Sequence, residues 1–95
     1  MKTTHHNQAS TQESRYPIDF TPSLLTGVTV SSAVATHTVY PSGSALTITT
    51  NVSSPTVYVN VPAGLAVGTN VIMVVVTTSD SALSPVHRLI ILTQV

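Results

Sequence analysis

Residues 69–92 read TNVIMVVVTTSDSALSPVHRLIIL, and this stretch decides the fold. Its two apolar runs are rich in β-branched residues, which suit the pleated surface of a strand. Between the runs lie Asp80, three serines and Pro85, residue types that favour turns. The stretch therefore predicts two long strands joined by a polar turn. Strands this apolar must be covered on at least one face, either by the rest of a small sandwich or by a partner.

The sequence before residue 69 also predicts strands, but shorter ones. Apolar and polar side chains alternate in short runs that Pro, Gly and Ser residues separate. The expected strands span residues 16–20, 28–30, 33–40, 46–51 and 56–61. No window shows a helical period. Six to seven short strands separated by turns predict an all-β fold, a small antiparallel β-sandwich.

Composition narrows the class of protein. The chain has 95 residues, enough for one domain, and only 6% of them are charged, whereas an ordinary domain has about 25%. Its formal net charge of zero provides no basic surface for nucleic acid. The absence of cysteine excludes disulfides and thiolate metal sites. A chain with so little charge lacks the repulsion that keeps a monomer soluble, which favours a packed or oligomeric protein.

The first fifteen residues are polar and show no apolar pattern. We expect residues 1–15 to form an extended N-terminal arm, flexible or docked on a partner, ahead of a sandwich domain at residues 16–95. The arm lacks the apolar core of a secretory signal peptide, and no stretch reaches the length of a membrane-spanning helix. Two adjacent histidines, His5 and His6, are too few for a metal site, so we interpret them as part of a solvated arm.

Residues able to do chemistry are scarce in the predicted sandwich. Asp19 and Asp80 each lie beside a turn, where we expect their carboxylates to bind backbone amides rather than form a catalytic pair. His37 and His87 lie within strands, and we interpret both as surface or interface residues. No glycine-rich loop of the kind that holds a phosphate is present. The sequence therefore assigns no catalytic residue, cofactor or metal site, and it favours a protein that is not an enzyme.

A few side chains are candidates for an interface with another protein. Tyr16 and Tyr58 have rings suited to anchoring an interface, although tyrosines also occupy sandwich edges. Ile18 and Phe20 share one side of a segment that is either a short edge strand or a docking segment.

Arg88 is the fifth candidate, because it shares a row with Val86, Ile90 and Leu92. If that row is buried, the guanidinium needs an acidic partner, which could only be one of the two aspartates of the predicted sandwich. Alternatively, the row faces an interface.

Six short motifs between about residues 17 and 93 resemble those of a known family. They are Ile18-Asp19-Phe20, Leu24-Leu25, Val28-Thr29-Val30-Ser31, Gly68-Thr69, Val75-Val76-Thr77-Thr78-Ser79-Asp80 and Arg88-Leu89-Ile90-Ile91. The family is that of small Ig-like virion proteins of bacteriophages, of the fiber-tail adaptor or capsid decoration type. The resemblance implies an Ig-like sandwich and a non-enzymatic structural part of the virion. It also implies attachment to phage capsid or neck and tail proteins, as a cement protein or as an adaptor. The low charge and the apolar strands add the expectation of a homo-oligomer in the particle.

The alternative function is a carbohydrate- or ligand-binding β-sandwich module. Such a module needs aromatic platforms and polar clusters on one face. The chain offers three tyrosines, one phenylalanine and no tryptophan, which favours the structural function over this one.

Overall fold

The computed structural model describes residues 2–21, 24, 26–80 and 82–93. These residues form seven strands and no α-helix. The strands are β1 (Lys2–Asn7), β2 (Ser14–Asp19), β3 (Val30–Tyr40), β4 (Thr49–Ser53), β5 (Thr56–Val61), β6 (Gly68–Thr78) and β7 (Val86–Thr93).

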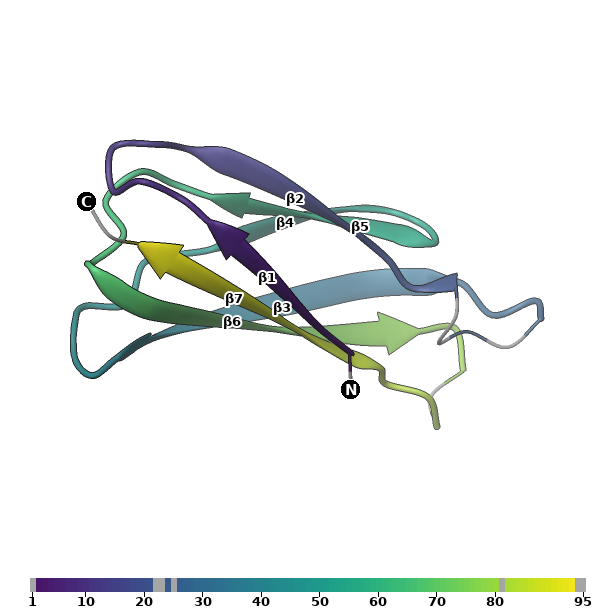
Figure 1. Cartoon of the computed structure of the whole chain (residues 1–95). Coiled ribbons are helices and arrows are strands. Elements are labelled where there is room, and N and C mark those ends of the chain that lie inside the picture. Colours follow the sequence, from purple (N-terminus) through teal and green to yellow (C-terminus); the bar gives the residue numbers. More distant parts are fainter. Residues whose placement is uncertain (1, 22–23, 25, 81, 94–95) are drawn as a thin grey trace.

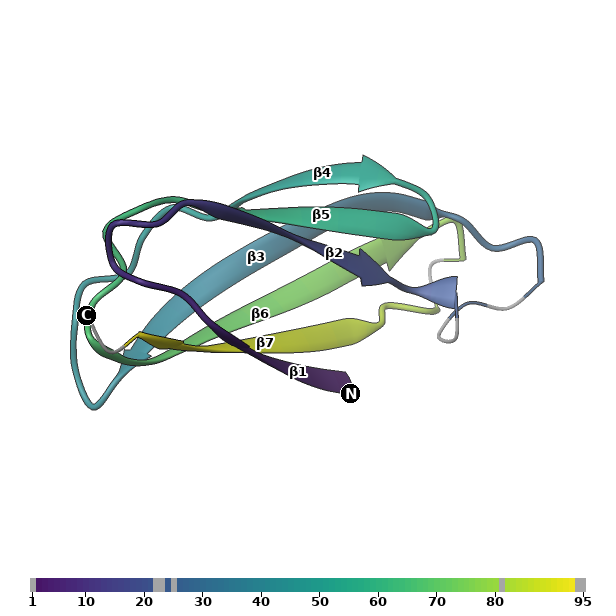
Figure 2. The ribbon, with the colours of Figure 1, turned by 45° about the horizontal axis from the view of Figure 1, so that its top comes forward.

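Two sheets pack face to face as a sandwich (Figure 1). The larger sheet has the order β1-β7-β6-β3 and the smaller one β2-β5-β4. With β1 set aside, these orders correspond to the G-F-C and B-E-D strands of an Ig sandwich. The predicted all-β, Ig-like sandwich is thus confirmed. One pairing departs from the antiparallel prediction, because β1 runs parallel to β7, as Figure 2 shows.

The two long strands predicted from residues 69–92 are confirmed as β6 and β7, which pair antiparallel. In the loop between them, Asp80 Oδ1 accepts a hydrogen bond from the backbone N–H of Ala82 at 3.0 Å. Asp19 acts in the same way after β2, where its Oδ1 accepts from the N–H of Thr21 at 2.9 Å. Both aspartates therefore stabilise turns, as their positions predicted.

The core lies between the sheets and consists mainly of valine, isoleucine and leucine. Every second residue of β5, β6 and β7 points into it, because successive side chains of a strand face opposite sides of its sheet. The buried cluster contains Ile18, Phe20, Val30, Ile48, Val57, Val59, Val61, Leu65, Ile72, Val74, Val76, Leu89 and Ile91.

Two predicted strand boundaries differ from the structure. Residues 28–30 and 33–40 were expected as separate strands, whereas residues 28 and 29 lie outside any strand and β3 runs unbroken from Val30 to Tyr40, with a register shift between Val30 and Ser32. Serines at this point were expected as a turn or a bulge, and the register shift corresponds to a bulge. β4 begins only at Thr49, and the buried Ile48 before it fills the core from outside a strand.

The N-terminal segment differs from the predicted separate arm at residues 1–15. Residues 2–7 form an edge strand of the larger sheet, in register with residues 87–92 of β7, and β2 already begins at Ser14. An edge strand can be held by backbone hydrogen bonds to a single neighbour, so it needs no apolar face of its own. For this reason the polar sequence gave no sign of a strand.

Gln8 fixes the end of β1 to the sandwich. Its side chain is buried, and its Nε2 donates to the Gln12 carbonyl at 2.8 Å. Its Oε1 accepts from the Tyr16 hydroxyl at 2.6 Å, and its backbone N–H donates to the Leu92 carbonyl at 3.2 Å. The connection between β1 and β2 is therefore packed against the domain rather than detached from it.

Candidate interaction surface

The outer side of the larger sheet carries a patch rich in apolar side chains on β3, β6 and β7, next to the polar outward residues Thr3, His5 and Asn7 of β1. Its side chains alternate along β3, β6 and β7 with those that enter the core, and the register of the three strands places them in adjacent rows. We define the apolar face as the outward residues Val34, Thr36, Thr38 and Tyr40 of β3, Thr69, Val71, Met73 and Val75 of β6, and Val86, Arg88, Ile90 and Leu92 of β7.

Several of these side chains are open to solvent. Val34 is 64% exposed and Val75 is 41% exposed, and Tyr40 and Leu92 are exposed as well. Given a strand spacing of about 4.8 Å and a rise of about 3.3 Å per residue, the three-stranded face covers roughly 300 Å². The largest apolar patch on an ordinary monomer covers about 300–600 Å² and is often functional, so this face has the size of such a patch.

Arg88 carries the charge of this face. It is half-buried between its neighbours, with Met73 beside it on β6 and Thr3 beside it on β1. Its Nε and Nη2 both donate to Thr3 Oγ1, each at 3.4 Å, which is long for a hydrogen bond. Of the two alternatives for this row, the buried ion pair with an aspartate is wrong, since Asp19 and Asp80 hold turns elsewhere.

The outer side of the smaller sheet has the opposite character. Its outward residues are Arg15, Pro17, Asp19, Thr49, Asn51, Ser53, Thr56, Tyr58 and Asn60, which we call the polar face. Arg15 is held within this face, because its Nε donates to Asn60 Oδ1 at 2.9 Å and its guanidinium lies 5.8 Å from the centre of the Tyr58 ring. The two faces of one small domain thus differ sharply in polarity.

The five predicted interface residues do not gather on one surface. Ile18 and Phe20 are core residues, 3% and 2% exposed, so they cannot contact a partner while the sandwich is folded. Tyr16 faces inward beneath β1, with its ring 4.5 Å from that of His6. Tyr58 lies on the polar face, and only Arg88 lies on the apolar face. The row that contains Arg88 was visible in the sequence, whereas its continuation across β6 and β3 depends on the register.

Two histidines interpreted as surface or interface residues are buried instead. His37 Nδ1 accepts from the backbone N–H of Leu46 at 2.8 Å, so Nε2 carries the proton and donates to Asn70 Oδ1 at 2.8 Å. The Nδ2 of Asn70 in turn donates to the Thr93 hydroxyl at 3.2 Å. The Nε2 atom of His87 lies 3.1 Å from Thr4 Oγ1. The His87 ring also packs edge-on against the Phe20 ring. Both imidazoles are buried because strand parity turns them inward.

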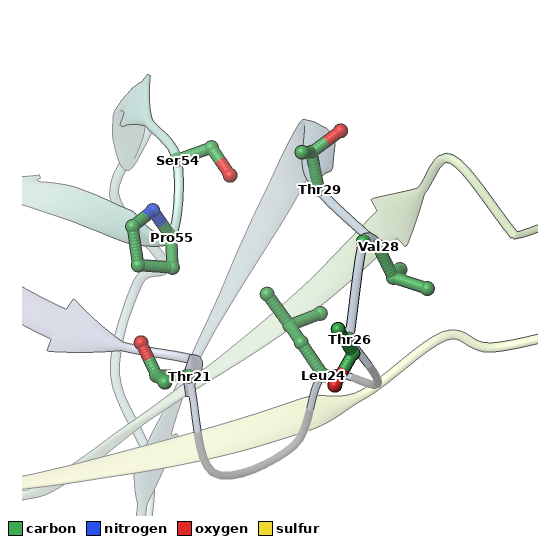
Figure 3. A pocket seen from close by; sticks show the side chains of 8 residues that line it. Thr21, Leu24, Thr26, Val28, Thr29, Ser54 and Pro55 are labelled. Carbon is green, nitrogen blue, oxygen red and sulfur yellow. The ribbon is translucent and has the colours of Figure 1, made fainter.

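A hollow of about 440 Å³ is lined by the loops after β2 and β4, to which the loop after β6 is also joined (Figure 3). Hydrogen bonds join these loops, among them Ser54 Oγ to the Val30 N–H and Ser79 Oγ to the Thr29 N–H, each 3.0 Å long. The described lining residues are Thr21, Leu24, Thr26, Gly27, Val28, Thr29, Ser54 and Pro55. None of these lining residues carries an ionisable or aromatic side chain, so they offer neither acid–base chemistry nor a platform for a sugar ring.

The described part of the chain offers neither a metal site nor a membrane-spanning helix. Among residues 2–21, 24, 26–80 and 82–93, no three His, Cys, Asp or Glu side chains come together as a metal site. The same residues include no helix of the length and apolarity needed to cross a membrane.

Comparisons with protein-family models, with curated proteins and with solved structures found no match for this chain. The resemblance to phage virion proteins therefore stays a prediction from the sequence motifs.

Proposed function

We propose that this chain is a non-enzymatic structural module of a bacteriophage particle, and that it attaches to a capsid, neck or tail protein through the apolar face. The observation that carries the proposal is the contrast between the two outer faces. The polar face has hydroxyl, amide and charged side chains suited to water, whereas the apolar face exposes valine, leucine and tyrosine. Exposed patches of this kind mark surfaces that associate with other proteins.

The size of the apolar face supports attachment to a repetitive assembly. A stable interface buries about 800 Å² on each partner, which is more than the roughly 300 Å² of this face. A single contact through the face would therefore be weak unless residues around it contribute. Copies that also touch one another on a symmetric shell or ring would bind as a linked set, and the resulting avidity would offset weak single contacts.

The test is to measure how much of the protein is present in purified particles. The experiment compares Val75→Asp on the apolar face with Val67→Asp in the loop before β6, because both valines are exposed, at 41% and 62%. We expect wild type and Val67→Asp to be retained in particles and Val75→Asp to be lost. Quantitative mass spectrometry gives the copy number, which distinguishes a decoration protein from a neck or tail adaptor. Absence of the wild-type chain from intact particles would overturn the proposal.

A further inference from the structure

We infer that the apolar face binds a protein surface which places a carboxylate opposite Arg88. The inference rests on the proposed function and specifies the chemistry of the partner. It starts from the position of Arg88, which lies within the apolar face, between Val86 and Ile90 along β7 and beside Met73 on β6. A partner that covers this face must also cover the guanidinium.

The contacts of Arg88 leave most of its hydrogen-bonding capacity available to a partner. A guanidinium has five N–H donors, and this one directs two of them at a single neutral oxygen, Thr3 Oγ1, at 3.4 Å. Arg15 on the polar face is different, since Asn60 Oδ1 lies 2.9 Å from its Nε and the Tyr58 ring packs near its guanidinium. One arginine is thus held within its own domain, whereas the other is held only loosely.

Desolvation decides what the partner must supply. Covering a charged group with an apolar surface costs several kcal/mol unless an opposite charge and hydrogen bonds replace the water. The described outward residues of the apolar face include no Asp or Glu, so the compensating charge must come from the partner. A carboxylate fits best, because it accepts two parallel N–H bonds from a guanidinium.

The same argument disfavours a second copy as the stable occupant of the apolar face, so that self-association through this face is weak. Two apolar faces packed on each other would bring together two Arg88 residues and no acid from either face. The area of roughly 300 Å² is also well below what a stable dimer needs. The occupant is therefore a different protein of the particle, with an apolar surface that carries Asp or Glu.

Binding to particles assembled without this chain tests the inference. We expect Arg88→Met to weaken binding at least about tenfold and to remove its salt dependence, because the charge pair is lost while the apolar contact remains. Arg15→Met is the matched control and should bind within about twofold of wild type. Thr3→Val removes the oxygen that Arg88 now contacts and should bind like wild type.

A lysine at position 88 allows the carboxylate to be captured. Arg88→Lys places a primary amine at the site, and a water-soluble carbodiimide couples an amine to an adjacent carboxylate as an amide. The carbodiimide takes up the elements of water as a urea. We expect a cross-link from position 88 to an Asp or Glu of one particle protein, absent in wild type and in Arg15→Lys, and located by peptide mass spectrometry.

The outcomes separate this inference from the proposed function. One contrary outcome is that particles bind wild type and Arg88→Met equally well, and another is that Thr3→Val loses as much affinity as Arg88→Met. Either result would overturn the inference of a partner carboxylate opposite Arg88, while attachment through the apolar face would remain as proposed. A cross-link between two copies of this chain would also overturn the inference, in favour of self-association. If particles bind no variant of the chain, the proposed function itself fails.

Discussion

At the scale of single residues, the buried chain from His37 through Asn70 to Thr93 shows how this domain accommodates polar groups in its core. Asn70 is fully buried and connects the imidazole, the Ala66 carbonyl and the Thr93 hydroxyl. We expect Asn70→Ala to lower the free energy of unfolding by about 2–3 kcal/mol, since it leaves buried partners without hydrogen bonds. Urea titration measures this, with Asn51→Ala on the exposed β4 strand as the control. Equal midpoints for the two variants would contradict the expectation.

Tyr16 predicts how stability depends on alkaline pH. Burial raises the pKa of Tyr16 above its ordinary value of 10.0, and a hydrogen bond with Ser14 opposes the rise in part. A tyrosine whose folded-state pKa is raised contributes stability that is fully present below pH 10 and is lost as the pH rises through the folded pKa. In addition, ionisation removes the proton that the hydroxyl donates to Gln8 Oε1.

We therefore expect the urea midpoint to fall as the pH rises above about 10, and to fall less steeply in Tyr16→Phe. Tyr40→Phe, which alters an exposed ring, should retain the wild-type slope. If the urea midpoint of Tyr16→Phe falls as steeply at alkaline pH as that of wild type, a group other than Tyr16 causes the fall.

At the scale of elements, β1 is the strand most readily opened. It has a polar sequence and only one neighbouring strand, β7, whereas β6 lies between two strands and is buried on its inner side. Local openings follow such differences in buried apolar contact. We expect amides of residues 3–7 to exchange with deuterium faster than those of residues 71–76 in the isolated protein, and to slow in the particle. Equal protection of the two strands in the isolated protein would show that β1 is as firmly held as the core.

The strands differ in how far the sequence could predict them, and the reason is physical. β6 and β7 were predictable because their β-branched runs and the turn chemistry between them are local signals. β1 was not, since its residues pair with a strand more than eighty positions away and present no apolar period. The candidate surface divides in the same way: the row around Arg88 follows from parity within β7, whereas Val34 and Val75 join it only through pairing between strands.

At the scale of the whole molecule, low charge and one apolar face predict weak self-association at high concentration. We expect Val34→Asp to raise the solubility limit and to abolish concentration-dependent association, because it adds charge at the most exposed valine of the face. Val67→Asp is the matched control, as these two valines are 64% and 62% exposed. Sedimentation velocity over a concentration series measures the effect. A wild-type chain that stays monomeric at millimolar concentration would contradict it.

The parallel pairing of β1 with β7 has a consequence for biosynthesis. Thr4 and His87 touch across 83 positions of sequence, and β1 leaves the ribosome long before β7 has been translated. Contacts of such separation form late, and incomplete sheets expose edges that aggregate. The larger sheet therefore closes only once its last strand has emerged. A ribosome that stalls before Val86 would display a nascent chain in which β6 has an open edge and β1 has nothing to pair with.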